Sequence, residues 1–279
     1  MDVSAADLKR LREKTGAGML DCRNALVKSG GDFARAERLL KEQGLAAAAK
    51  RSGRATSAGK IFVKVMPGRA VVLELDCETD FVARNDQFLR LGSSLVDMVA
   101  SKGLAAKTDE MELMVKDVIG RIKENMALSR FTTITAGPDE MLADYVHDDR
   151  IGVVVKAKLS DAKLAADPAV KQTLFECALH LAAFAPQFLS REKVPADWLA
   201  EQESIFREQV KAMDKPANVL QGIVKGKVSK LLSEVCFLEQ PFVKDEKRKV
   251  AKVLEDLGKQ VGGTVAAVDF VYYRVGESA

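Results

Sequence analysis

The chain has 279 residues, enough for two or three compact units, and its 43 Lys and Arg against 40 Asp and Glu leave a formal net charge of only +3. So small an excess argues against a dedicated nucleic-acid-binding protein, and four dispersed cysteines without a CxxC pair argue against a zinc site or a disulfide framework. The sequence has no apolar run of membrane-spanning length and opens without a leader pattern, so we expect a cytoplasmic protein with no membrane partner.

Residues 1–44 predict a bundle of three short helices. Glycine-containing turns at 15–18 and 29–31 separate the helices, Asp32 is placed to cap the third, and Gly44 is expected to end it. The pattern resembles a ubiquitin-associated-type bundle. A unit of this size is too small for chemistry, so we interpret it as a docking domain.

The segment 45–60 is rich in Ala, Lys, Arg, Ser and Gly, which is typical of a helix tail leading into a flexible linker. A β-hairpin with a turn at Pro67 is predicted over 61–75, followed by two amphipathic helices and a strand near 131–135. This order predicts a small antiparallel sheet with helices on one face, forming an N-terminal core subdomain of residues 61–140.

The tetrapeptide Thr79-Asp80-Phe81-Val82 follows the predicted hairpin and allows two interpretations. If Asp80 capped one uninterrupted helix, Phe81 and Phe88 would share a face at i and i+7, and Phe81 would belong to the core. If Asn85 instead capped a helix that begins later, Phe81 would lie on an exposed loop. The periodicity of the apolar residues does not decide between them.

The second half repeats the same theme around a strand at 151–159. Asp167 and the proline after it predict the start of a helix that Pro186 ends, Asp245 is expected to cap a last helix, and a β-rich run covers 264–275. The fold class is therefore α+β, with two related subdomains that each combine a small antiparallel sheet with helices. The C-terminal core subdomain is split into two parts, residues 141–187 and 233–279.

Two amphipathic helices occupy the intervening segment 188–232 and predict an inserted helical hairpin. Their apolar stripes consist of Leu199, Phe206, Val210 and Met213 on one helix and Val219, Ile223 and Val228 on the other. The sequence leaves open whether these stripes pack on each other or on a partner.

A search for catalytic chemistry finds no catalytic residue, no metal site and no cofactor motif. The two histidines, His147 and His180, lie in neither a metal-ligand pattern nor a nucleophile–base pattern. From its neighbours alone, His147 is interpreted as a loop histidine paired with a nearby acid, and His180 as a structural group on a helix flank. The chain is therefore expected not to be an enzyme.

Several separated blocks of the sequence, in the same order, resemble the elongation factor Ts family. These blocks are Leu-Arg-Glu-Lys-Thr-Gly-Ala-Gly-Met at 11–19, Thr-Asp-Phe-Val at 79–82, Ile-Lys-Glu-Asn at 122–125, Tyr-Val-His at 145–147, Arg-Ile-Gly-Val at 150–153, Lys-Pro at 215–216, Lys-Gly-Lys at 225–227 and Leu-Glu-Gln-Pro-Phe-Val at 238–243. The resemblance implies a protein that binds the GTPase elongation factor Tu in translation and accelerates release of its GDP.

The resemblance also assigns roles by motif. It implies that Asp80 and Phe81, within Thr79–Val82, insert as a wedge near the Mg²⁺ site of the GTPase. Arg12, Met19 and Leu20 would grip the GTPase domain from the bundle, and Ile122 and His147 would support contact with the partner from the core. The helical hairpin would serve as a dimerisation segment, so that a homodimer is a further expected partner arrangement. The competing interpretations are a ubiquitin-associated-type adaptor with an inert core and, third, an RNA-binding role suggested by the basic segment 50–54.

Overall fold

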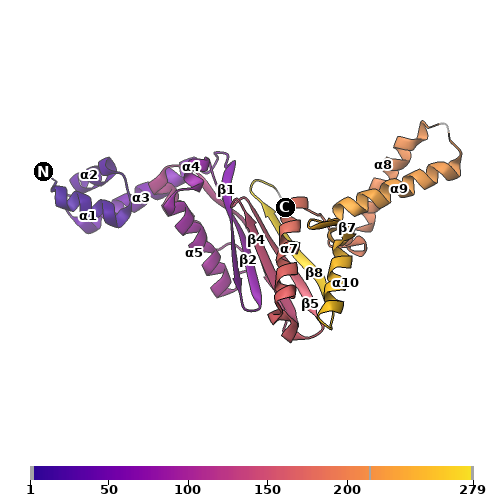
Figure 1. Ribbon diagram of the computed structural model, residues 1–279. Coiled ribbons are helices and arrows are strands. Elements are labelled where there is room, and N and C mark those ends of the chain that lie inside the picture. The colour runs from indigo at the N-terminus through magenta and orange to yellow at the C-terminus, as the bar shows by residue number, and fades with distance from the viewer. Residues whose placement is uncertain (1–2, 214, 278–279) are drawn as a thin grey trace.

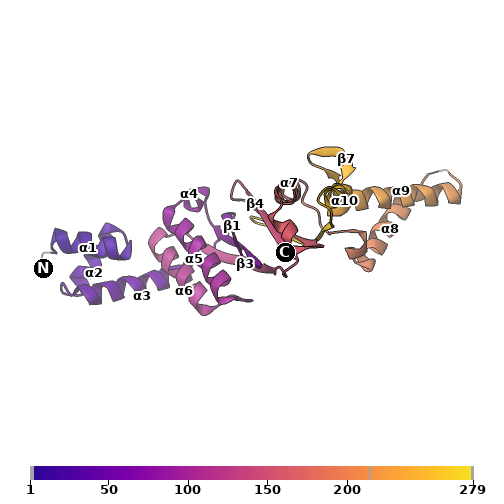
Figure 2. The same cartoon turned by 60° about the horizontal axis from the view of Figure 1, so that its bottom comes forward.

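The elements of the protein follow one another along an extended molecule, with a helical bundle at one end and a helical hairpin at the other (Figures 1 and 2). The structure is a computed structural model that describes residues 3–213 and 215–277. Between the two ends lie two three-stranded sheets with their covering helices. Among the described residues, none of the helices combines the length and the apolar character that crossing a membrane requires.

The bundle is built from helices α1 Ala5–Thr15, α2 Met19–Lys28 and α3 Phe33–Arg51. The Asp32 side chain caps α3 as predicted, by accepting a hydrogen bond from the Arg35 N–H at 3.0 Å. The expected end of this helix at Gly44 is wrong, because α3 continues for seven residues to Arg51. Gly44 lies where α3 passes α6, and a side chain on Gly120 of α6 would come within 2.7 Å of the Gly44 Cα. The glycines therefore permit a close helix contact instead of ending a helix.

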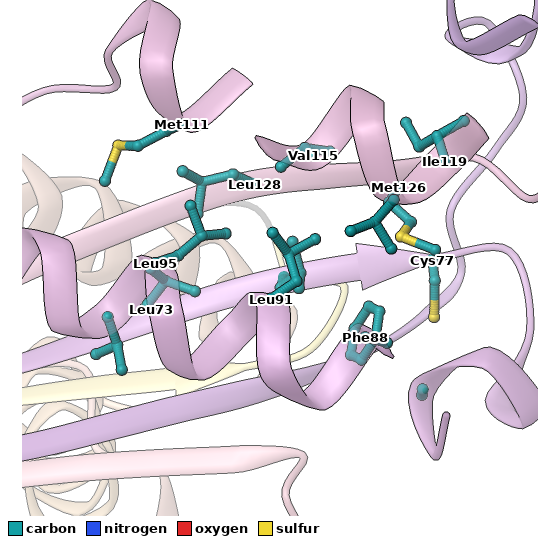
Figure 3. Close-up of a cluster of buried hydrophobic side chains, with 14 of the residues drawn as sticks. Leu73, Cys77, Phe88, Leu91, Leu95, Met111, Val115, Ile119, Met126 and Leu128 are labelled. Carbon is teal, nitrogen blue, oxygen red and sulfur yellow. The ribbon is translucent and has the colours of Figure 1, made fainter. Parts of the chain in front are cut away.

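The first sheet has the order β1-β2-β3, with antiparallel neighbours throughout. Its strands are β1 Ala58–Met66, β2 Arg69–Cys77 and β3 Met126–Thr135. Helices α5 Asp86–Lys102 and α6 Asp109–Ile122 cover one face, where Leu73, Phe88 and Leu95 are fully buried (Figure 3). The predicted N-terminal core subdomain therefore has the expected layers, although its first strand begins at Ala58, inside the expected linker.

The second sheet has the order β4-β5-β8 and is also antiparallel. Its strands are β4 Glu140–His147, β5 Ile151–Leu159 and β8 Val265–Arg274. Helices α7 Pro168–Phe184 and α10 Val250–Gln260 cover one face of this sheet. A short 3-10 helix, Ala162–Ala166, precedes α7. The helix start at Asp167 is confirmed, because its carboxylate accepts from the Ala169 N–H at 2.7 Å.

The helix expected after Asp245 begins later. Residues Asp245–Lys249 form β7, which pairs with β6 Pro241–Phe242, and α10 starts at Val250. Asp245 instead stabilises the turn into β7, where its carboxylate accepts from the Lys247 N–H and from the Arg248 guanidinium. Its role as the cap of the last helix is therefore wrong.

The two sheets pack face to face, which the sequence did not predict. An apolar cluster joins them, made of Ile61, Ala70, Val72, Ile134, Val154, Tyr273 and Val275. Gly152 permits the contact, because a Cβ there would lie 2.3 Å from the Ile61 side chain. The Ile61 N–H also donates to the Asp149 carbonyl at 2.7 Å. The core is therefore a helix–sheet–sheet–helix stack.

The inserted hairpin consists of α8 Ala196–Lys211 and α9 Ala217–Val235, with short 3-10 turns at Arg191–Lys193 before it and Phe237–Glu239 after it. The two helices contact each other, and Val210, Val224 and Leu232 are buried. Part of the apolar surface is therefore buried between α8 and α9, in agreement with the interpretation that the stripes pack on each other.

Candidate functional site

The tetrapeptide Thr79–Val82 forms a turn that leaves Phe81 outside the core. Thr79 caps the single-turn helix α4 Asp80–Ala83 by accepting from the Val82 N–H at 3.4 Å. A second cap follows at once, since Asn85 Oδ1 accepts from the Gln87 N–H at 2.8 Å and starts α5. The chain is therefore broken between two helices, and the interpretation of one uninterrupted helix is wrong. Phe81 is 83% exposed.

The neighbours of Phe81 anchor this turn. Val82 and Ala83 are buried in the core of the first subdomain. The Cys77 thiol donates to the Thr79 carbonyl at 3.1 Å, and burial raises the pKa of this thiol to about 12, so it stays protonated. The exposed Phe81 ring is therefore carried by a turn whose backbone is held in place by its buried neighbours.

Polar groups of the segment after α6 hold the same turn from the side. The Thr79 hydroxyl donates to the Glu124 carboxylate at 3.0 Å. The Asn125 N–H donates to Glu78 Oε1 and its side-chain amide donates to the Arg54 carbonyl, both at 2.6 Å. The sequence pattern of 122–125 gave no hint of these bonds, because they depend on tertiary pairing.

The predicted docking residues lie on the bundle and are accessible. Arg12 is exposed in the last turn of α1, and Met19 and Leu20 are exposed at the start of α2, Leu20 at 65%. The next residue, Asp21, forms an ion pair with Lys123 at 2.7 Å. The start of α2 is thereby connected to the segment that also holds Thr79.

Ile122 and His147 occupy different subdomains. Ile122 ends α6, is half-buried and packs against the core of the first sheet. His147 ends β4 of the second sheet instead of lying in a loop. Its Nε2 lies 3.5 Å from Asp148 Oδ2, and its Nδ1 lies 3.0 Å from the Tyr145 hydroxyl. The neighbouring acid is therefore in place, Ile122 is part of the packing of the first subdomain, and His147 is accessible.

An aromatic contact of Tyr145, the residue whose hydroxyl lies beside His147, was missed by sequence reasoning. Phe175 of α7 is exposed and packs edge-on against Tyr145, with ring centroids 6.0 Å apart. A Phe on the outer face of an otherwise core-forming helix was the available signal.

His180 is a buried structural group. Its Nδ1 accepts from the Val243 N–H at 3.1 Å and its Nε2 lies 2.9 Å from Gln240 Oε1. Burial lowers the pKa of His180, in keeping with a neutral ring that joins α7 to the segment after the hairpin.

Sequence reasoning also missed a buried charged cluster between the sheets. The Glu74 carboxylate pairs with Arg130 at 2.6 Å and accepts from the Gly276 N–H at 2.7 Å. Asp76 accepts from the Ser129 hydroxyl, and burial raises the pKa of Asp76 to about 6. Through Gly276, this cluster ties the segment just after β8 to β2. Among the described residues, no group of three or more His, Cys, Asp or Glu side chains could hold a metal ion.

Comparison with known proteins gives a single answer. The family model described as "Elongation factor TS" matches residues 78–277. The chain is 44% identical over 277 residues to elongation factor Ts of Treponema denticola, covering 99% of both chains. It is 39% identical over 278 residues to elongation factor Ts of Borrelia hermsii, covering 99% of this chain and all of the relative. The chain belongs to the elongation factor Ts family.

Members of the elongation factor Ts family are non-enzymatic exchange factors of translation, and membership implies nucleotide exchange on elongation factor Tu. The matched region starts at Glu78, directly before the turn, and includes Ile122 and His147. Arg12, Met19 and Leu20, the residues predicted to dock, lie before it, within the part shared with the full-length relatives.

Proposed function

We propose that this chain promotes GDP release from elongation factor Tu by inserting Asp80 and Phe81 near the Mg²⁺ site of the GTPase. The observation that carries the proposal is the 83% exposure of Phe81 on an anchored single-turn helix. A large exposed apolar ring gains free energy when a partner covers it, and a rigid backbone spends little of that gain on ordering.

The expected size of the effect is sufficient for exchange. Full burial of a Phe side chain is worth about 1.5–3 kcal/mol, which corresponds to a shift of about ten- to a hundredfold in an equilibrium constant. By linkage, a factor that binds the nucleotide-free GTPase more tightly lowers the affinity of the GTPase for GDP by the same factor by which GDP lowers its affinity for the exchange factor.

We propose further that Arg12, Met19 and Leu20 dock the bundle on the GTPase domain. Exposed apolar side chains beside a cation are the composition of a binding surface. His147 provides a second contact from the other sheet, and Ile122 supports the first subdomain from within its core.

We also propose that the helical hairpin is a self-association segment. A groove of about 610 Å³ runs between its helices, and its lining combines apolar residues such as Leu220 and Val228 with charged residues such as Arg207 and Lys225. Ile205 and Val219 remain exposed on the same two helices. A second copy of the hairpin could cover these residues in a two-fold contact.

Phe81→Ala tests the main proposal, with Val65→Ala as the matched control. Val65 is also an exposed apolar residue, but it pairs with Ala70 at the far end of the hairpin whose near end pairs Ala58 with Cys77. We expect release of labelled GDP from elongation factor Tu to slow by about tenfold or more for Phe81→Ala and to stay near wild type for the control.

The melting temperature of Phe81→Ala should stay within about 2 °C of wild type, because an exposed side chain contributes little to folding. Wild-type release rates with a stable Phe81→Ala variant would refute the wedge. A large loss of stability would instead show that Phe81 serves the core.

A further inference from the structure

The four-residue segment 122–125, here called the connector, joins α6 to β3 and reaches three separate parts of the molecule. Lys123 follows the last residue of α6 and caps it, with a left-handed backbone (φ of 68°) and its N–H donating to the Ile119 carbonyl at 2.8 Å. A non-glycine residue rarely adopts this conformation, which here turns the chain sharply between helix and strand. Successive side chains of the connector then diverge toward different elements.

The Lys123 side chain reaches the docking bundle. Its ammonium lies 2.7 Å from the Asp21 carboxylate of α2, 102 residues earlier in the chain. Asp21 directly follows Met19 and Leu20, the exposed apolar residues of the proposed docking surface. The ion pair therefore fixes the helix that carries them relative to α6.

The Glu124 side chain reaches the turn that carries Phe81. Its carboxylate accepts from the Thr79 hydroxyl, whose oxygen in turn accepts from the Val82 N–H. A hydroxyl that donates to a carboxylate becomes a better acceptor, so the bond to Glu124 strengthens the cap of α4. Phe81 lies inside the single turn that this cap closes.

Asn125 completes the arrangement and is 5% exposed. Its N–H binds the Glu78 carboxylate and its side-chain amide binds the carbonyl of Arg54, just after α3. Glu78 in turn lies 3.4 Å from the Arg54 guanidinium. The end of α3 and the residue before Thr79 are thus held by the same connector.

We propose that the connector is a positioning element that sets the docking surface and the Phe81 wedge in one fixed arrangement. Lys123 positions the docking helix, and Glu124 positions the wedge. Both residues act through others, so neither needs to touch elongation factor Tu. The inference rests on the proposed function for its effect on exchange, but the positioning itself is measurable in the free protein.

The Glu124 arm is tested by Glu124→Leu, with Glu124→Gln as the conservative variant that keeps an acceptor for the Thr79 hydroxyl. We expect the maximal rate of GDP release at saturating factor to fall by about tenfold for Glu124→Leu. The concentration for half-maximal rate should change by less than about twofold, and Glu124→Gln should retain most of the rate. In the free protein, amide hydrogen exchange at Val82 should accelerate in the Leu variant only.

Combination with Phe81→Ala separates positioning from direct contact. If Glu124 acts only through the wedge, Glu124→Leu adds no further loss to Phe81→Ala, because interacting sites are non-additive. A multiplicative loss, an equal loss in the Gln variant, or unchanged Val82 exchange would overturn the proposal.

The Lys123 arm is tested by Lys123→Glu and by the charge swap Lys123→Glu with Asp21→Lys. The single variant should raise the half-maximal concentration by about two- to fivefold at low salt and leave the maximal rate unchanged, as an exposed ion pair would. The swap should restore the wild-type value. A changed maximal rate, or no recovery in the swap, would overturn this arm.

Failure of the proposed function gives a different pattern. If Phe81→Ala releases GDP at the wild-type rate, the wedge is wrong, and the hydrogen-exchange comparison of the Glu124 variants still decides whether the connector positions the turn.

Discussion

Asp76 shows how a single residue of the core can oppose folding at neutral pH. It is 6% exposed, it faces the second sheet, and its Oδ1 has no hydrogen-bond partner among the described residues. Burial raises its pKa from 3.8 to about 6, the Glu74 carboxylate adds to the rise, and the Ser129 hydroxyl and Arg130 oppose it. The folded protein therefore binds a proton that the unfolded chain has already lost.

The sign of the pH dependence follows from this pKa. Below about pH 4 both states hold the proton, so stability is unaffected. Between pH 4 and 6 the folded state keeps the proton that the unfolded state releases, so stability falls as the pH rises. Above pH 6 the penalty is complete, and a rise of about two pKa units sets it at no more than about 3 kcal/mol.

We therefore predict that Asp76→Asn stabilises the protein at pH 7.5 and not at about pH 3, where both states hold the proton. The amide keeps an oxygen for the Ser129 hydroxyl and removes the buried charge. Thermal unfolding should give a melting temperature that is higher than wild type by about 2–6 °C at pH 7.5, with the difference vanishing in acid. Asp269→Asn, on an exposed position of β8, is the charge-matched control. A gain that is the same at both pH values would contradict the assignment.

At the scale of elements, the hairpin is an insertion whose two ends are fastened together. The Gln187 and Phe188 N–H groups donate to the Val235 carbonyl, and the Phe237 N–H donates to the Phe188 carbonyl at 2.8 Å. His180 of α7 also binds Gln240 and Val243, which follow the hairpin. The segments before and after the insertion are therefore bonded to each other without the help of α8 or α9.

This closure predicts that residues 190–234 can be replaced by a Gly/Ser linker of about four residues without unfolding the core. GDP release measured at high factor concentration should stay within about twofold of wild type. If the hairpin mediates self-association, light scattering should show the mass falling from a dimer to a monomer. Ile205→Lys, which charges an exposed position of α8, should also separate the dimer while leaving the hairpin folded. A full-length chain that is monomeric at every concentration would remove the dimerisation role.

Most elements could be predicted from local patterns, and the failures have physical causes. The position of Phe81 was undecidable from periodicity, because only the bond from the Gln87 N–H to Asn85 shows where the helix restarts. Asp245 is a residue type that often caps a helix, but it begins β7 directly after a hairpin turn, where its carboxylate accepts from the Lys247 N–H. The sequence of β2 carried one signal for the stacking of the sheets, its mostly apolar composition, since a strand buried on both faces has few polar residues. Glu74 and Asp76 interrupt this apolar run and weaken the signal.

At the scale of the whole molecule, helix α3 connects the bundle to the core, because it packs in both. Ala36 in its first half belongs to the bundle core, and Ala48 in its second half belongs to the core of the first sheet. Between them Gly44 touches Gly120 of α6. The expected end of the third helix at Gly44 thus missed that the helix continues unbroken to Arg51, since a glycine inside the helix was interpreted as a stop when it permits a close crossing with α6.

The crossing predicts opposite outcomes for two matched substitutions. A Cβ at Gly120 would lie 2.7 Å from the Gly44 Cα, which only a shift of one helix can relieve, whereas a Cβ at Gly44 would lie 3.5 Å from the Gly120 Cα in ordinary contact. Gly44→Ala should therefore gain about 1 kcal/mol of helix propensity and raise the melting temperature by about 2–4 °C.

Gly120→Ala should lose stability and move α3, and with it the docking surface, away from α6. The half-maximal factor concentration for GDP release should then rise several-fold while the maximal rate changes little, because the Phe81 turn stays on the core. Small-angle X-ray scattering should detect a changed maximum dimension for Gly120→Ala only. Equal behaviour of the two variants would show that the bundle does not depend on this contact for its position.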